Sequence, residues 1–315
     1  MQRPVGGPEL TEPLARAAYR SLHHRLLRLP DELAVYPTHG AGSFCAAPAG
    51  GRRTTAIGAE RRYNRLLAAA DEDAFVAELL AGYGSYPPYF LRLRDRNRAG
   101  PELLGHDWQV LQPLSTDQVG EHTAGGAVLV DARPVTAFAA GHVPGALSIA
   151  LRPQFGTWLG WLADDTQALV FVLEEGQDRG ELVRQCRTIG YDRLAGELAG
   201  GMAAWRAAGL PEARLPLVEP GQIDHQHGLV LDVRQASEVA DGHLPGAVPV
   251  ELGVLADGQR APRLPQGPVT VMCSHGQRAM TAASLLQRAG RTDVRVLQGG
   301  AEDWAQATGR SLVRR

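Results

Sequence analysis

Runs of apolar residues alternate with helical patterns along most of the chain. Residues 127–130 and 229–231 are continuous apolar runs, and a β-branched run at residues 269–272 ends at Cys273. Short, unbroken runs of this kind are typical of strands that are covered on both faces. Because they alternate with helical patterns, for example at residues 180–189, the sequence predicts an α/β fold with mostly parallel sheets flanked by helices.

The same series of motifs occurs twice, which is the sign of an internal repeat. An Asp-x-Arg strand end at residues 131–133 is followed by the turn Gly-His-Val-Pro-Gly-Ala at residues 141–146. Both motifs return 101 residues further on, and a Gly-Gly pair followed by a tryptophan closes each unit. Each unit therefore spans about a hundred residues, a common size for a small α/β domain.

The first hundred residues lack these motifs. Residues 14–27 have the pattern of an amphipathic helix, and residues 33–45 that of a strand leading into a Gly-rich loop. Residues 71–80 predict a further helix capped by Asp71 or Asp73. Two prolines at the start of residues 87–90 predict an extended segment.

The candidate chemistry lies in the loop at residues 273–278, Cys-Ser-His-Gly-Gln-Arg, between a predicted strand and a predicted helix. A thiol at a helix N-terminus lies in a nest of backbone N–H groups, and Arg278 adds a positive charge. These surroundings favour the thiolate, which is the nucleophilic form. The alternative is a small apolar cysteine that ends a buried strand, but the complete C-x-x-G-x-R loop is more specific than that.

Together these motifs resemble the rhodanese (sulfurtransferase) family over about two thirds of the chain. The resemblance implies two rhodanese-like domains, at residues 111–213 and 214–315, and no cofactor. It also implies that Cys273 takes a sulfane sulfur from an anionic donor and passes it to a thiol or to cyanide. The backbone N–H groups that would surround the persulfide belong to the rest of the loop: Ser274, His275, Gly276, Gln277 and Arg278.

The roles of the neighbouring polar residues stay open at this point. The resemblance implies that Asp232 supports the loop by hydrogen bonding, but with Arg234 it can equally form a structural pair that holds a turn. His243 belongs to the turn that marks the fold, and we expect it to be architectural. His275 either tunes the choice of donor and acceptor or is simply solvated.

The first repeat has lost these chemical groups. Leu173 stands in place of Cys273, and Asp178 in place of Arg278. Leucine cannot carry a persulfide, and the acidic loop would repel anionic donors. We therefore predict an inert first repeat that serves as a scaffold or as one wall of the site, with Cys186 packed inside its next helix.

The segment before the repeats resembles part of the metallo-β-lactamase fold. Tyr36-Pro-Thr-His39-Gly is similar to its last metal-ligand loop, and residues 55–62 and 87–94 are similar to the helical tail of persulfide dioxygenases, the branch fused to rhodaneses. The main metal motif of that family, His-x-His-x-Asp-His, does not occur in the sequence, so we predict no metal site from His39 alone. Residues 1–110 are thus expected to be a partial α+β segment of this fold, left by truncation, a split gene or a misplaced start. A partner chain would have to supply the missing half.

Composition limits the other possibilities. The 315 residues carry a net charge of −2 without basic tracts, which gives no reason to expect nucleic acid or anionic membranes as partners. No apolar stretch is long enough to span a bilayer. Three widely spaced cysteines argue against a disulfide framework and fit a reducing cytoplasm, while the many Ala, Gly, Arg and Leu residues suggest a bacterial source.

We therefore expect a sulfurtransferase that acts through a Cys273 persulfide, with thiosulfate, glutathione persulfide and a protein persulfide all open as donors. The alternative is a non-catalytic, rhodanese-like remnant of a persulfide dioxygenase fusion. A thiol phosphatase is disfavoured, because related folds of that kind place the arginine six positions after the cysteine. Arg278 follows Cys273 by five.

Overall fold

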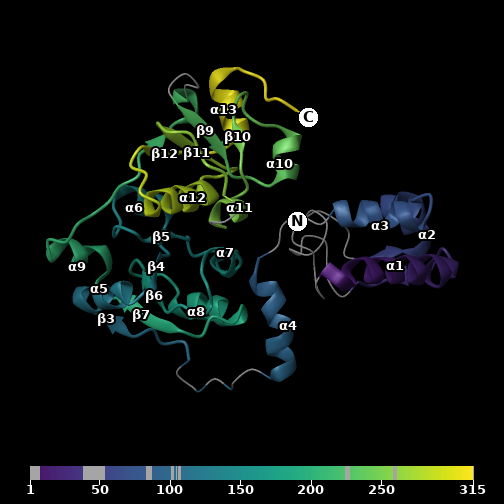
Figure 1. The fold of residues 1–315 in the computed structure, drawn as a ribbon, viewed down its shortest axis with the longest axis horizontal. Coiled ribbons are helices and arrows are strands. Elements are labelled where there is room, and N and C mark those ends of the chain that lie inside the picture. The colour runs from purple at the N-terminus through teal and green to yellow at the C-terminus, as the bar shows by residue number, and fades with distance from the viewer. Residues whose placement is uncertain are drawn as a thin grey trace. The chain divides into compact units, whose positions relative to one another are not determined.

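The computed structural model describes residues 8–37, 54–82, 87–100, 103, 105, 108–223, 228–257 and 261–314. The chain divides into two compact units, Met1–Tyr86 and Pro87–Arg315 (Figure 1). His39 and Cys45 lie outside the described residues.

The first unit is mainly helical. Helix α1 (Pro8–His24) packs on α3 (Glu72–Ala81), and the short strands β1 (Ala34–Val35) and β2 (Thr55–Ala56) pair antiparallel before α2 (Ile57–Tyr63). Asp71 rather than Asp73 caps α3, because its carboxylate accepts a hydrogen bond from the backbone N–H of Ala74 at 2.8 Å. The small core of this unit is formed by Ala15, Phe75 and Val76.

The second unit begins with a helix where the sequence predicted an extended segment. Helix α4 (Tyr89–Ala99) starts directly after Pro88, whose backbone is already helical (φ −54°, ψ −31°). Proline is tolerated at a helix start because the first N–H groups have no partner within the helix. Helix α4 packs on the first repeat, where Tyr89 is buried and Arg92 forms an ion pair with Asp165 at 3.1 Å.

Each repeat contains a five-stranded parallel sheet with the same strand order. In the first repeat the order is β3-β7-β6-β4-β5, and in the second it is β8-β12-β11-β9-β10. The apolar runs of the sequence form β4, β9 and β11, in which every residue is buried except the half-buried Leu229. The predicted α/β fold with parallel sheets flanked by helices is therefore confirmed.

The strands of the first repeat are β3 (Pro113–Leu114), β4 (Val128–Asp131), β5 (Leu147–Ser148), β6 (Leu169–Val172) and β7 (Leu194–Leu198). Its helices are α5 (Thr116–Ala124), α6 (Val135–Ala140), α7 (Phe155–Leu162), α8 (Arg179–Thr188) and α9 (Gly201–Ala207). The strands of the second repeat are β8 (Leu217–Val218), β9 (Leu229–Asp232), β10 (Val248–Pro249), β11 (Val269–Met272) and β12 (Val294–Leu297). Its helices are α10 (Ala236–Asp241), α11 (Leu252–Ala256), α12 (Gln277–Arg288) and α13 (Ala301–Thr308).

A buried ion pair holds the same turn in both repeats. Arg234 binds Asp232 with both oxygens engaged, at distances of 2.7–3.0 Å, and donates to the carbonyl of Gly242 at 2.8 Å. Arg133 and Asp131 form the same pair in the first repeat. Since both repeats contain the pair, it serves the fold that they share.

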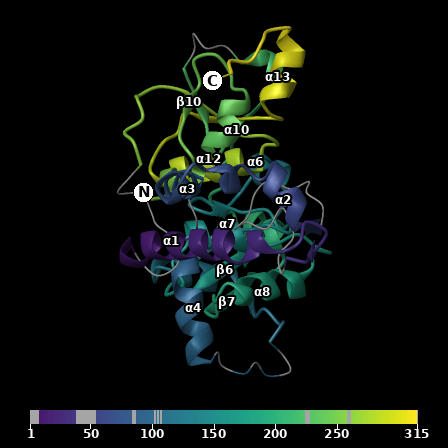
Figure 2. The ribbon, with the colours of Figure 1, turned by 90° about the vertical axis from the view of Figure 1, so that its right-hand side faces the viewer.

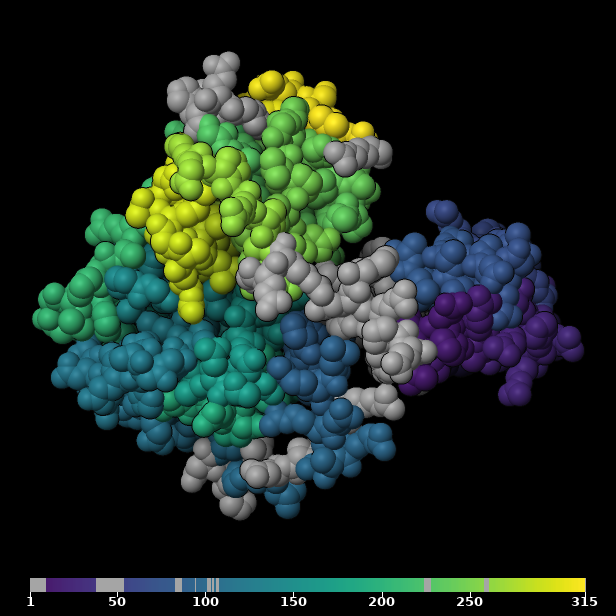
Figure 3. Space-filling view, in the orientation of Figure 1, coloured from purple at the N-terminus to yellow at the C-terminus, as the bar shows by residue number. Residues whose placement is uncertain are grey.

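The two repeats pack against each other through helix α12. In both ribbon views α12 lies between the two sheets (Figure 1 and Figure 2). The Thr281 hydroxyl donates to the carbonyl of Ser148 at 2.7 Å, and the Ser148 N–H donates to the Ser284 hydroxyl at 3.1 Å. One apolar core continues from the first repeat into the second, and the space-filling view shows the repeats in direct contact (Figure 3). The first repeat thus anchors the helix that follows the Cys273 loop.

Candidate active site

Cys273 directly follows β11, which lies between β9 and β12 in the sheet of the second repeat. Sites in parallel sheets form at the carboxyl ends of the strands, and Cys273 occupies such an end. Its side chain is only 1 % exposed and belongs to the apolar core that continues through both repeats.

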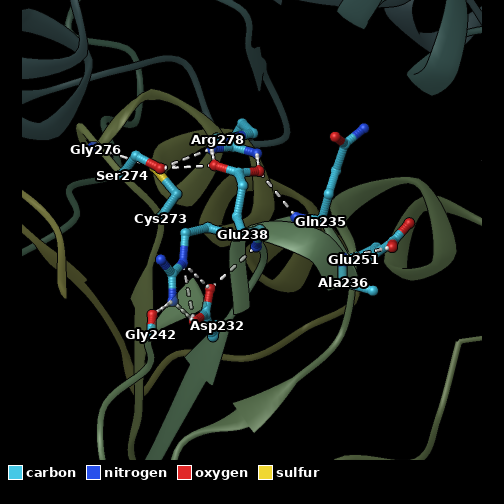
Figure 4. A network of polar contacts seen from close by, with 11 residues as sticks. Asp232, Gln235, Ala236, Glu238, Gly242, Glu251, Cys273, Ser274, Gly276 and Arg278 are labelled. Atoms are coloured by element: carbon cyan, nitrogen blue, oxygen red, sulfur yellow. Dashed lines mark hydrogen bonds and ion pairs between the residues drawn. The ribbon is translucent and has the colours of Figure 1, made fainter. Parts of the chain in front are cut away.

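The loop folds around the sulfur. Gly276 has a left-handed backbone (φ +84°), and its N–H donates a hydrogen bond to Cys273 Sγ at 3.1 Å (Figure 4). Helix α12 begins at the next residue, and no side chain caps it. The first N–H groups of a helix have no partner within the helix, so they remain as donors at this end. The sulfur therefore lies beside a helix N-terminus, where negative charge is stabilised.

The Gly-Gly pair near the end of each repeat allows the backbone to pass close to this loop. A Cβ atom at Gly300 would lie 2.4 Å from the carbonyl oxygen of Ser274, so only glycine fits. In the first repeat, a Cβ atom at Gly201 would lie 2.9 Å from the carbonyl oxygen of Leu173. The motif that closes each repeat in the sequence is thus a packing requirement of the loop.

Arg278 is held by a carboxylate that the sequence did not point out. Both Glu238 oxygens accept hydrogen bonds from the Arg278 guanidinium, at 2.6 and 2.7 Å (Figure 4). The Ser274 hydroxyl joins them, since it donates to Glu238 at 2.9 Å and accepts from Arg278 at 3.0 Å. Arg278 therefore braces the loop against α10, and Glu238 offsets its charge.

The charge of Glu238 is well stabilised. Burial opposes its ionisation, but the hydrogen bonds and charge of Arg278 outweigh burial, helped by Gln235 and Ser274, and lower the pKa of Glu238 to about 2. The pKa of Arg278, the partner of Glu238, is raised. Burial alone would lower this pKa, but the hydrogen bonds and charge of Glu238 have the larger effect. The pair stays ionised across the neutral pH range.

The other residues predicted from the sequence have different surroundings. Asp232 is fully buried and its two oxygens bind Arg234, while the His243 ring donates to the carbonyl of Val239 at 3.0 Å and so belongs to the turn. His275 is exposed, and Gln277 is half-buried at the first turn of α12. The structure thus brings together Cys273, Ser274, Gly276 and Arg278.

Comparison with known proteins agrees with this geometry. The model of the Rhodanese-like domain matches residues 115–208 and 219–307, more than half of the chain. The chain belongs to the rhodanese-like family. A thiosulfate sulfurtransferase GlpE of Pseudomonas fluorescens (strain SBW25) is 37% identical over 91 residues, which are 29% of this chain and 83% of that protein. GlpE of Pseudomonas putida (strain GB-1) is 35% identical over 92 residues, again 29% and 83%.

A solved structure extends the comparison. The crystal structure titled metallo-beta-lactamase from Staphylococcus aureus subsp. aureus COL has a TM-score of 0.50 at 23% identity. The match covers 63% of this chain and 54% of that one, so the chain spans about half of its length. At this identity the likeness shows the fold. Because the matched share is larger than residues 1–110, it includes part of the rhodanese-like repeats.

The first rhodanese-like repeat keeps the loop and lacks its reactive groups. Gly176 has the same left-handed backbone as Gly276 (φ +81°), and Leu173 is buried. The Asp178 carboxylate caps α8 by accepting from the N–H of Glu181 at 2.9 Å. A carboxylate of the chain itself thus occupies this helix N-terminus. Cys186 belongs to α8 and its side chain is fully buried. This burial raises the pKa of its thiol.

Glu238 could have been found by comparing the two rhodanese-like repeats. At the position 101 residues earlier stands Ala137, so the repeat that has Asp178 in place of Arg278 also lacks the partner of Arg278. The coupled replacement of Arg278 and Glu238 between the repeats was the missed signal.

No metal site is assembled by the described residues. Over these parts of the chain, no three His, Cys, Asp or Glu side chains are grouped so as to hold a metal ion. Among the helices in the described ranges, none has both the length and the apolar character needed to cross a bilayer.

Proposed function

We propose that this protein is a sulfurtransferase that moves sulfane sulfur from thiosulfate or a persulfide to a thiol or to cyanide, through a persulfide on Cys273. The observation that carries the proposal is the Cys273 sulfur at the N-terminus of α12, hydrogen-bonded to the Gly276 N–H. The names of the GlpE relatives support the same reaction class.

The reaction is two displacements at sulfur. The Cys273 thiolate attacks the outer sulfur of thiosulfate, a new S–S bond forms, and sulfite leaves with the electron pair of the broken S–S bond. The persulfide is an anion, and the helix N-terminus with its free N–H groups stabilises it. An acceptor thiolate or cyanide then attacks the outer sulfur, and the Cys273 thiolate leaves.

Each neighbour has a defined task. Gly276 donates to the sulfur, and the Arg278–Glu238–Ser274 network fixes the loop that presents it. Gly300 lets the loop pass close to the segment before α13. Asp232 and Arg234 hold the turn beneath the site.

The test is a mass measurement on the purified chain. Incubation with thiosulfate, or separately with glutathione persulfide, is expected to add one sulfur atom, which cyanide or a thiol then removes. Cys273→Ser is expected to abolish the adduct, whereas Cys186→Ala, which removes a fully buried thiol, is expected to retain it. An adduct that persists in Cys273→Ser would place the sulfur on another residue and contradict the proposal, and the absence of an adduct with either donor would favour the non-catalytic alternative.

We further propose that the chain derives from a persulfide dioxygenase–rhodanese fusion, which keeps glutathione persulfide among the candidate donors. The solved metallo-beta-lactamase that shares the fold of this chain supports this origin. A metal bound through His39 would need ligands from a partner chain, so metal analysis of the purified chain is expected to find no stoichiometric iron or zinc. The two free buried thiols fit a reaction in the reducing cytoplasm.

A further inference from the structure

A cavity of about 400 Å³ lies in the first repeat, between α5, α9 and the turn at residues 143–145. Small-molecule sites in proteins are commonly concave, with volumes of roughly 300–1,000 Å³ and mainly apolar walls. The residues that line this cavity include Val119, Leu129, Val143 and Trp205, all of which are buried. The cavity therefore has the size and the apolar walls of a ligand site.

The last residue of α12 brings a positive charge to this cavity. Arg288 belongs to the second repeat, but it lines the cavity and donates a hydrogen bond to the carbonyl of Gly145 at 3.2 Å. It is the one charged residue among the described residues of the lining, and no carboxylate in the described part of the chain is bonded to it. A guanidinium has five N–H donors, so the donors that are not bonded to Gly145 can bind an anion.

The polar side-chain atoms of the cavity walls are bonded within the chain. The indole N–H of Trp205 donates to the carbonyl of Pro211 at 2.8 Å, and the Thr123 hydroxyl donates to the carbonyl of Val119 at 2.9 Å. These groups offer little to a polar ligand. We therefore expect a ligand with an apolar body and an anionic group that reaches Arg288.

The second repeat covers the equivalent tryptophan with its own residues. Val230, Leu244 and Trp304 stand at the equivalent positions and belong to one apolar core. Trp304 is fully buried, and the guanidinium carbon of Arg310 lies 5.5 Å from the centroid of its ring. The short 3-10 helix η3 (Pro220–Gln222) replaces α5 in this repeat and contacts α13. The cavity beside Trp205 is therefore a property of the first repeat and not of the shared fold.

We propose that this cavity binds a small amphipathic carboxylate, whose apolar body packs against Trp205 and whose carboxylate binds Arg288. The inference is independent of the proposed sulfur transfer, because Cys273 is not among the residues that line the cavity. A bound molecule would contact both repeats, since Arg288 ends the helix that begins beside Cys273.

Calorimetric titration of the purified chain with two probes tests this inference. The probes are hydrocinnamate, an aromatic carboxylate, and hydrocinnamamide, its uncharged counterpart. Hydrocinnamate is expected to bind at least about tenfold more tightly, because it alone forms charge-assisted hydrogen bonds with a guanidinium. In Arg288→Gln the two probes are expected to bind equally weakly, and Arg288→Lys is expected to restore part of the preference.

Two further variants locate the site. Thr123→Leu places a larger apolar side chain in the cavity and is expected to weaken the binding of both probes; leucine is compatible with α5, because the Thr123 hydroxyl is bonded to its own helix. Arg184→Gln is the matched control, since it removes an exposed arginine of α8 that pairs with Glu181, and it is expected to leave both affinities unchanged.

Three results would overturn the inference: no binding of either probe at millimolar concentration, a preference for hydrocinnamate that persists in Arg288→Gln, or unchanged affinities in Thr123→Leu. Sulfur loading of Cys273 is measured separately by intact mass. A failure of the carboxylate site therefore leaves the proposed function intact, and a chain that binds hydrocinnamate without loading sulfur retains the site and loses the function.

Discussion

The two repeats have one scaffold and opposite chemical properties. Each has the same strand order, the same Asp–Arg pair beneath the turn and the same left-handed glycine in the loop. Around that loop they differ at five positions: Leu173 against Cys273, Glu174 against Ser274, Glu175 against His275, Asp178 against Arg278 and Ala137 against Glu238. The fold is therefore maintained whether or not the loop contains a cysteine.

The helix that follows each loop shows the difference most clearly. In the first repeat, Asp178 caps α8 and places a carboxylate at its N-terminus. In the second, no side chain caps α12, and the Gly276 N–H is bonded to sulfur. A helix N-terminus stabilises a nearby anion. In the first repeat this anion is the Asp178 carboxylate, whereas in the second repeat the Cys273 sulfur lies at the equivalent helix end.

The largest effect is expected from moving the cysteine between the repeats. Leu173→Cys in a Cys273→Ser background is expected to remain at least about 10³-fold below the wild-type rate of sulfur loading, because Asp178 repels anionic donors. Loading is measured by intact mass with thiosulfate. Recovery of turnover in this variant would show that loop charge is unimportant.

A sharper version of this experiment adds Asp178→Arg and Ala137→Glu, which rebuild the ion pair of the active repeat. If positions 137, 173 and 178 account for the difference, the combined variant loads more sulfur than Leu173→Cys alone, although Glu174 and Glu175 are unchanged. Equal rates would place the difference elsewhere in the repeat.

A smaller effect, on stability, is expected to be the same in both repeats. Asp131→Asn and Asp232→Asn each leave a buried arginine without its counter-charge, and each is expected to lower the free energy of unfolding by about 3 kcal/mol. Urea unfolding measures both losses. While folded, the Asp131→Asn protein is expected to load sulfur at the wild-type rate. Slower loading in that variant would mean that the pair in the first repeat also shapes the distant loop.

The smallest effect concerns acid stability and the Arg278–Glu238 ion pair, which has no counterpart in the first repeat. The folded pKa of Glu238, about 2, lies below the ordinary value of 4.5, so its pair with Arg278 contributes fully above pH 4.5 and is lost as the pH falls toward 2. Glu238→Gln removes a contribution on the order of 1 kcal/mol, reduced by solvent screening, and weakens the dependence of stability on pH in that window.

Glu181→Gln breaks an exposed pair with Arg184 on α8 and serves as the control. It is expected to have little effect on the melting temperature between pH 7 and pH 3, because exposed pairs contribute little. If Glu238→Gln behaves like Glu181→Gln, the Arg278 brace does not stabilise the fold.

Patterns within short stretches of sequence predicted most of the fold. The site was predicted less completely, because it also depends on contacts between residues far apart in the sequence. The apolar runs that became β4 and β11 and the two Asp–Arg strand ends were readable because each is continuous in sequence. Glu238 was missed because it reaches the Cys273 loop from another element, α10. The helix at Tyr89–Ala99 was missed because its two leading prolines favour both an extended segment and a helix start.

The anchoring of α12 on β5 has a consequence for how such a gene can evolve. Thr281 and Ser284 are buried against Ser148, and Ala283 and Met280 lie in the apolar core that both repeats share. Deleting the first repeat would expose this flank of α12 to water and remove its hydrogen bonds to Ser148. The first repeat can therefore lack a cysteine in its loop, but the surface on which α12 packs is still required.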